Sequence, residues 1–171
     1  MTRIGLISDT HSYLDPAVIK YLKEVDLILH AGDIGSGEVL DALKKIKPVL
    51  AVYGNIDGAE LRSKLPLVLR TTIEKVEILM THIAGYPGKY NSSALALLNS
   101  KEPRLFICGH SHILKVIYDK QYKLLHMNPG AAGIYGIHKI QTLLRFSIHE
   151  EIIKDLEIVE FGRKNKGHSP I

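Results

Sequence analysis

Five short apolar runs in this chain each lead directly into Asp, Asn or His. The polar segments that follow them are Asp9-Thr10-His11, Asp33, Asn55, His82 and His110-Ser111-His112. Short apolar runs bounded by turn residues are typical of buried strands, and in open α/β sheets ligands bind beyond the carboxyl ends of the strands. We therefore predict that these polar residues converge on one site. Asp33 is expected at its centre, as a carboxylate shared by two metal ions.

The order of the predicted elements changes along the chain, and this change indicates the fold class. Strands alternate with helices from residue 3 to residue 53, which predicts parallel strands joined by right-handed crossovers. Beyond Leu67 the chain reads mostly as strands. We therefore expect an α/β protein, a four-layer α-β-β-α sandwich in which two mixed sheets are flanked by helices. The predicted strands are 3–8, 27–30, 48–53, 67–73, 75–81, 104–108, 113–118, 123–127, 141–148 and 152–159, with helices from Pro16, from Ser36, through Arg62 and over 92–98.

Length and composition limit the class of protein. A chain of 171 residues with 46% hydrophobic residues fits one domain with a real core, which we place at 1–161, followed by a disordered basic tail at 162–171. The single cysteine, Cys108, excludes a disulfide framework and is compatible with a reducing compartment. No run approaches the ~18 apolar residues of a membrane span, so a cytoplasmic location away from membranes is expected. The net charge of +4 is spread along the chain, which argues against nucleic-acid binding.

Each polar motif also has a simpler explanation when it is taken alone. Asp33 could cap the helix that begins near Ser36, and Asp9 and Asn55 are residue types common in turns. His82 could be a hydrogen-bonded residue at a strand end. The convergence of all seven donors favours a metal site instead, and their mixed nitrogen and oxygen atoms suit Mn, Fe, Zn, Ni or Co better than thiolate-seeking ions.

The remaining residues of interest carry weaker predictions. His30 either orients Asp33 or packs at a strand end, and Cys108 is expected to be an inert core thiol. A loop containing Tyr86, Tyr90 and Asn91 either lines a substrate pocket or is plain surface. No role in the site is predicted for the other four histidines, which are His126, His138, His149 and His168.

Taken together and in this order, the motifs resemble those of the calcineurin-like metallophosphoesterases. They are Asp-x-His, Gly-Asp, Gly-Asn, a lone His and Gly-His-x-His, and the resemblance covers residues 3–148. The short chain and the Asn128-Pro129-Gly130 turn are similar to the small single-domain phosphodiesterases of bacteria and archaea in that family.

The resemblance implies a ligand set and an activity. One metal ion would be held by Asp9, His11, Asp33 and His112, and the other by Asp33, Asn55, His82 and His110. Asp33, Asn55 and His82 are also the expected catalytic residues. Two divalent ions are expected, with Mn as the first choice and Ni, Fe, Zn, Co or Mg as alternatives. Their bridging hydroxide would hydrolyse a small phosphodiester, and a homo-oligomer is left open.

The chain departs from the family at one position, and this departure keeps other functions open. Most members carry His directly after the motif Asn, where this chain has Ile56. Because Ile56 cannot donate a proton, activity against poor leaving groups is in question, although Asp57 could fill part of the gap. The first alternative is a scaffold for protein–protein interaction, which is how the phosphoesterase-like subunit of the retromer coat uses this fold. The second is a nuclease, which fits the net charge but lacks a basic stripe.

Overall fold

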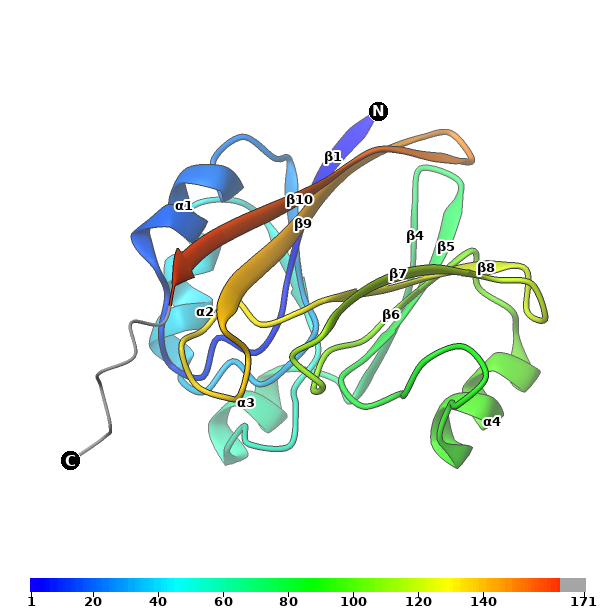
Figure 1. The fold of residues 1–171 in the computed structure, drawn as a ribbon, viewed down its shortest axis with the longest axis horizontal. Coiled ribbons are helices and arrows are strands. Elements are labelled where there is room, and N and C mark those ends of the chain that lie inside the picture. The colour runs from blue at the N-terminus through cyan, green and yellow to red at the C-terminus, as the bar shows by residue number, and fades with distance from the viewer. Residues whose placement is uncertain (164–171) are drawn as a thin grey trace.

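The computed structural model describes residues 1–163, which form ten strands and four helices (Figure 1). The strands are β1 (Thr2–Ile7), β2 (Leu27–His30), β3 (Val49–Ala51), β4 (Val68–Ile73), β5 (Val76–Thr81), β6 (Leu105–Ile107), β7 (Leu114–Asp119), β8 (Leu124–Pro129), β9 (Ile140–His149) and β10 (Ile152–Arg163). The helices are α1 (Pro16–Leu22), α2 (Gly37–Lys44), α3 (Ala59–Lys64) and α4 (Ser92–Ser100). Strand β10 extends two residues into the predicted tail, and the rest of that tail, 164–171, lies outside the described residues.

The strands form two mixed five-stranded sheets. The first has the order β10-β9-β1-β2-β3, in which β1, β2 and β3 are parallel and β9 is antiparallel to β1. The second has the order β4-β5-β6-β8-β7, in which β5, β6 and β8 are parallel. Strands β1, β2, β3, β5 and β6 are the ones followed by the predicted donors, so all five donor segments leave the carboxyl ends of parallel strands.

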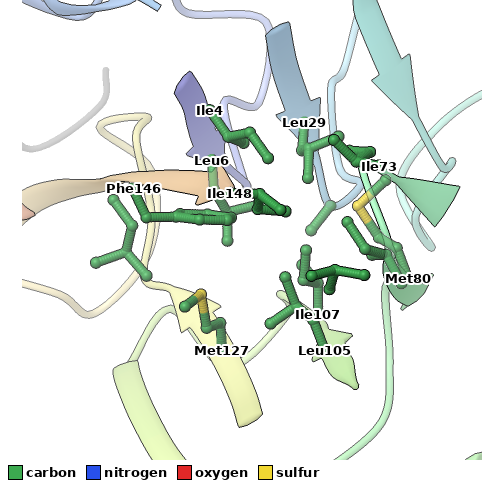
Figure 2. Packing of buried hydrophobic residues seen from close by; sticks show 14 of the residues in the cluster. Ile4, Leu6, Leu29, Ile73, Met80, Leu105, Ile107, Met127, Phe146 and Ile148 are labelled. Atoms are coloured by element: carbon green, nitrogen blue, oxygen red, sulfur yellow. The ribbon is translucent and has the colours of Figure 1, made fainter. Parts of the chain in front are cut away.

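The predicted four-layer arrangement is confirmed by where the apolar side chains pack. Successive residues of a strand face opposite sides of its sheet. Leu6 and Leu29 therefore face the second sheet and meet Met80 and Leu105 in the central core (Figure 2), whereas Ile28 faces outward.

Each outer face is covered by helices. Ile28 packs with Val18 of α1 and Leu40 of α2 on the outer face of the first sheet. On the outer face of the second sheet, Phe106 packs with Leu98 of α4. Figure 1 shows α1 and α2 on one side of the molecule and α4 on the other.

Helix α1 begins where the sequence predicts. The Asp15 carboxylate accepts a hydrogen bond from the Ala17 amide at 2.8 Å, and Pro16 occupies the first turn, where it loses no intrahelical bond. Among the described residues, no helix has the combination of length and apolar character needed to cross a membrane.

A buried histidine in the outer layer of the second sheet gives the protein a pH-dependent stability. His126 lies between the Tyr90 hydroxyl at 3.4 Å and the Cys108 thiol at 3.8 Å, and burial lowers its pKa to about 4. Burial also raises the pKa of Cys108 to about 12, which keeps it a core thiol. An unfolded histidine has a pKa of about 6.5, so below that pH the unfolded chain binds a proton that folded His126 excludes.

We therefore expect the free energy of unfolding to fall as the pH drops from about 6.5 towards about 4, by roughly 1.4 kcal/mol per pH unit for this group. Urea unfolding of the metal-free protein between pH 7.5 and pH 5 measures the effect. A His126→Gln variant should show a shallower pH dependence than the wild type. Parallel curves for the two proteins would contradict this assignment.

Candidate metal centre

The predicted donor residues sit in tight turns with an unusual backbone conformation. Positive φ angles occur at Asp9 (55°), His11 (47°), Asp33 (54°), His110 (66°) and His112 (56°). For residues other than glycine this conformation costs about 1–3 kcal/mol, and it persists at functional sites where the surroundings enforce it. At Asp9 and His11 backbone bonds help to enforce it, because their amides donate to the carbonyls of Gly32 and Asp33, each at 3.0 Å.

The side chains form two groups that could each hold a metal ion. Asp9, His11 and His112 form one group, and Asp33, His82 and His110 form the other; within each group the donor atoms lie within 4.8 Å of one another. In the first group, Nε2 of His112 lies 3.2 Å from Oδ1 of Asp9 and 3.3 Å from Nε2 of His11. Ligands about 2.0–2.2 Å from one ion lie about 3 Å apart, so these spacings fit a shared cation.

Asp33 lies between the two groups. Its Oδ2 is 3.2 Å from Nε2 of His82 and 3.8 Å from Nε2 of His11, so one oxygen faces a histidine of each group. The Ile56 amide donates to its other oxygen, Oδ1, at 3.0 Å. A Cβ on Gly54 would lie 2.0 Å from Oδ1, so only glycine allows Asp33 this position. The carboxylate is therefore held in the place that a shared ligand would need.

The two carboxylates are kept ionised by the histidines around them. Burial would raise the pKa of Asp9, but the positive charge that the adjacent imidazoles of His11, His112 and His82 can carry outweighs it and lowers that pKa. For Asp33, burial likewise raises the pKa, and the imidazole of His82, whose Nε2 lies 3.2 Å from Oδ2, reverses the direction. The pKa of His11 is raised, chiefly by the Asp9 carboxylate, whose Oδ1 lies 3.8 Å from Nε2 of His11. The site thus holds two ionised carboxylates among imidazoles, which are groups that a divalent cation could bind.

Two buried atoms show that the residues present fit a metal ion. Among the described residues, only Asp9 Oδ1 and His82 Nε2 are buried side-chain polar atoms without a hydrogen-bond partner. The Ala31 carbonyl can only accept, so at 2.7 Å it places a proton on Nδ1 of His82. In a neutral His82 the Nε2 lone pair then faces the Asp33 carboxylate at 3.2 Å, which is repulsive without a cation between them. A divalent ion would satisfy both atoms.

His138 is a site residue that the sequence analysis missed. Its Nε2 lies 2.8 Å from the Gly133 carbonyl, which can only accept, and its Nδ1 lies 3.2 Å from Nδ1 of His112. In a neutral His138 the Nδ1 atom then accepts the proton of His112, which leaves the His112 Nε2 lone pair directed at Asp9. A Cβ on Gly136 would lie 2.2 Å from Nδ1 of His112, so this glycine makes room for the contact. His138, for which the sequence predicts no role in the site, therefore contacts one of the predicted ligands in the structure.

Two further polar residues hold the turns in place. The Asn128 amide donates to the Gly109 carbonyl at 2.8 Å and to the Ser111 hydroxyl at 3.1 Å, which fixes the turn that carries His110 and His112. His30 accepts the Gly32 amide on Nδ1 at 3.2 Å, and burial lowers its pKa to about 4, so it is neutral at pH 7. His30 therefore positions the turn before Asp33. Ser36 occupies the cap position of α2, so Asp33 is not its cap.

The segment 55–57 combines one predicted ligand with two residues whose roles the structure clarifies. Asn55 is exposed and borders the same cavity as His82, and its role as a ligand stays a prediction. The Ile56 side chain is 45% exposed, and only its amide serves the site. The buried Asp57 carboxylate accepts the amides of Gly35 at 2.7 Å and Gly54 at 2.8 Å, so it joins two loops rather than filling the gap left at Ile56.

A cavity of about 460 Å³ opens beside His82 and Asn55. It lies between α3, which contributes Arg62, and α4, which contributes Leu97; both helices lie at the lower edge of the molecule in Figure 1. Of the loop residues singled out in the sequence, Asn91 lines this cavity, whereas Tyr90 is buried against Phe106.

Comparison with known proteins identifies the family. Residues 2–151 match the calcineurin-like phosphoesterase superfamily domain. The chain belongs to this superfamily. It is 30% identical over 162 residues to a probable metallophosphoesterase of Methanocaldococcus jannaschii. The aligned region covers 92% of this chain and 81% of the relative. It is also 33% identical over 170 residues to a probable metallophosphoesterase of Methanothermobacter thermautotrophicus, which covers 93% and 92%.

Solved structures confirm the fold. An archaeal phosphodiesterase superposes with a TM-score of 0.69 at 21% identity, covering 92% of this chain and 99% of that one. Vps29 of Entamoeba histolytica, solved with Zn²⁺, superposes with a TM-score of 0.70 at 19% identity, covering 94% and 99%. The calcineurin-like phosphoesterase fold expected from the motif order is therefore the fold of this chain.

Proposed function

We propose that this superfamily member is a metal-dependent phosphodiesterase with two divalent ions at the centre described above. The observation that carries the proposal is the buried pair Asp9 Oδ1 and His82 Nε2, which among the described residues lacks hydrogen-bond partners and lies within a cluster of carboxylates and imidazoles. Buried polar atoms of this kind are normally satisfied. Because a cation would pair with both atoms, the site suits a metal ion.

The residues would divide the work as follows. Asp9, His11 and His112 would hold one ion, and His82 and His110 would hold the other together with Asn55; Asp33 would serve both. Bound divalent ions lower the pKa of water and neutralise the charge that develops on phosphoryl oxygens. The chain itself fixes the Asp33 carboxylate through the Ile56 amide and fixes the His82 ring through the Ala31 carbonyl. Manganese is the metal we propose, because it suits a mixed oxygen and nitrogen donor set.

The proposed preference for a diester is supported by the chain's likeness to an archaeal phosphodiesterase. The residue at position 56 bears instead on the leaving group. A histidine that protonates the leaving group contributes about 10²–10⁴-fold in rate. With Ile56 in its place, we expect activity to depend strongly on how good the leaving group is.

The test is hydrolysis of bis-p-nitrophenyl phosphate by the purified protein, with and without added Mn²⁺. This diester has a good leaving group and does not need a general acid. Metal-dependent turnover would support the proposal. Absence of turnover in protein shown to bind metal would favour the second candidate, a scaffold that binds another protein, which the likeness to Vps29 and the exposed Ile56 side chain support.

The contact between His138 and His112 leads to a prediction about metal binding. Residues that orient a metal ligand typically contribute 10–100-fold in metal affinity. We therefore expect His138→Ala to weaken Mn²⁺ binding at the group of Asp9, His11 and His112 by about that factor, and to leave the second ion in place. Calorimetric titration with Mn²⁺ measures both sites. His149→Ala is the matched control, because His149 is an exposed histidine at the end of β9; equal affinities in the two variants would count against the role given to His138.

A further inference from the structure

The cavity beside the metal centre shares two residues with it, and this inference rests on the proposed function. His82 and Asn55 both line the cavity of about 460 Å³. A phosphoester whose phosphate meets the donor groups would therefore have one of its organic substituents at the mouth of this cavity. The volume falls within the roughly 300–1,000 Å³ typical of small-molecule sites and exceeds what a methyl or ethyl group needs.

The walls of the cavity are apolar and partly open to solvent. Leu67 and Ile83 are 55% and 41% exposed, and Val68, Ala94 and Leu97 complete this surface. Large apolar side chains that stay accessible beside a polar site are a feature of binding pockets. Burying them against an apolar ligand would be favourable, because apolar surface leaves water.

Two polar side chains in the lining, Asn91 and Thr81, turn their hydrogen-bonding groups towards the protein. The Asn91 amide nitrogen donates to the Ile83 carbonyl at 3.1 Å, and its oxygen accepts the Ala94 amide at 2.8 Å. The Thr81 hydroxyl donates to the Leu67 carbonyl at 3.3 Å. These groups are therefore already occupied, which makes the cavity less polar than its residue types alone would make it.

One side of the cavity carries a fixed positive charge. The Arg62 guanidinium lies over the Tyr53 ring, 5.0 Å from its centroid, and donates to the carbonyls of Asp57 at 2.6 Å and Asn55 at 3.0 Å. These contacts hold the cation near Asn55, at the end of the cavity that adjoins the metal centre. An apolar chamber with a cation at that end suits a molecule with an anionic phosphate at one end and an apolar group at the other.

We propose that this cavity is a specificity pocket that binds a ring-bearing, apolar substituent of the phosphoester, such as an aryl group. The pocket selects aromatic esters over small alkyl esters. The apolar walls hold the ring, Arg62 and the metal centre hold the phosphate, and the two contacts act on the same molecule.

The experiment compares two ligands and two variants by calorimetric titration of the Mn²⁺-loaded protein. Phenyl phosphate and methyl phosphate share the anionic group and differ in the ring. Burial of a ring of this size predicts that phenyl phosphate binds at least about tenfold more tightly. Ser93→Trp places a large side chain at an exposed position that lines the cavity, whereas Ser92→Trp adds the same bulk one residue away, outside the lining.

We expect Ser93→Trp to reduce the preference for phenyl phosphate to less than threefold without changing methyl phosphate binding, and Ser92→Trp to keep the wild-type preference. Equal affinity of the wild type for both ligands would overturn the pocket, and so would a full preference retained in Ser93→Trp. If the protein hydrolysed bis-p-nitrophenyl phosphate but showed no preference for phenyl phosphate, the pocket proposal would be wrong and the proposed activity would stand. If the protein preferred phenyl phosphate but did not hydrolyse bis-p-nitrophenyl phosphate, the pocket proposal would stand and the proposed activity would be wrong.

Discussion

Replacement of Asp33 by Ala is expected to abolish binding of both metal ions and to lower turnover of bis-p-nitrophenyl phosphate by more than about 100-fold. The physical reason is the position of Oδ2, 3.2 Å from Nε2 of His82 and 3.8 Å from Nε2 of His11. Loss of this oxygen would remove a ligand from both groups, and loss of a residue that merely orients a ligand already costs 10–100-fold. Metal content per chain after dialysis and steady-state turnover in Mn²⁺ measure the effect.

Two further variants distinguish the loss of a shared ligand from a general loss of negative charge. Asp41→Ala removes an exposed carboxylate on α2 and should keep both the metal content and the turnover. His112→Ala should halve the metal content, because His112 belongs to only one of the two groups. If His112→Ala lost both ions as completely as Asp33→Ala does, the division into two groups would be wrong.

The sequence could predict those parts of the site that depend on residues close together in the chain. An apolar run predicts a strand, and the residue after it must lie at a strand end. Because β1, β2 and β3 are parallel, the residues after them meet at one edge of the sheet. This is why the sequence could predict that Asp9 and Asp33 lie close together. The change from alternating elements to strands likewise indicated two sheets.

The parts that escaped prediction depend on loops meeting across long stretches of chain. The contact between His138 and His112 joins residues 26 positions apart, on either side of strands β7 and β8, so no local pattern marks it. His138 differs from the other three histidines without a predicted role only in standing in a glycine-rich stretch, and Gly136 is the glycine that makes room. The cavity is a similar case, since α3 and α4 meet around it only in the folded chain.

Asp57 shows how a plausible chemical role can give way to a structural one. From the sequence, its carboxyl group stands next to Ile56 and offers a proton donor where the family usually has histidine. In the structure that carboxylate is 2% exposed and accepts the amides of Gly35 and Gly54, which belong to the loops after β2 and β3. These loops carry Asp33 and Asn55. Asp57 therefore acts as a brace between these two loops.

This role predicts that Asp57→Asn destabilises the protein rather than removing a chemical step. The asparagine oxygen can accept only one of the two amides while its NH₂ group faces the other, and an unsatisfied buried donor costs about 1–3 kcal/mol. We expect the free energy of unfolding to fall by roughly 2–4 kcal/mol, because each lost bond is also charge-assisted. Urea unfolding measures it, with Asp41→Asn as the exposed control. A variant with wild-type stability and no turnover of bis-p-nitrophenyl phosphate would instead assign Asp57 to the chemistry, because a brace cannot be removed without loosening the loops that it joins.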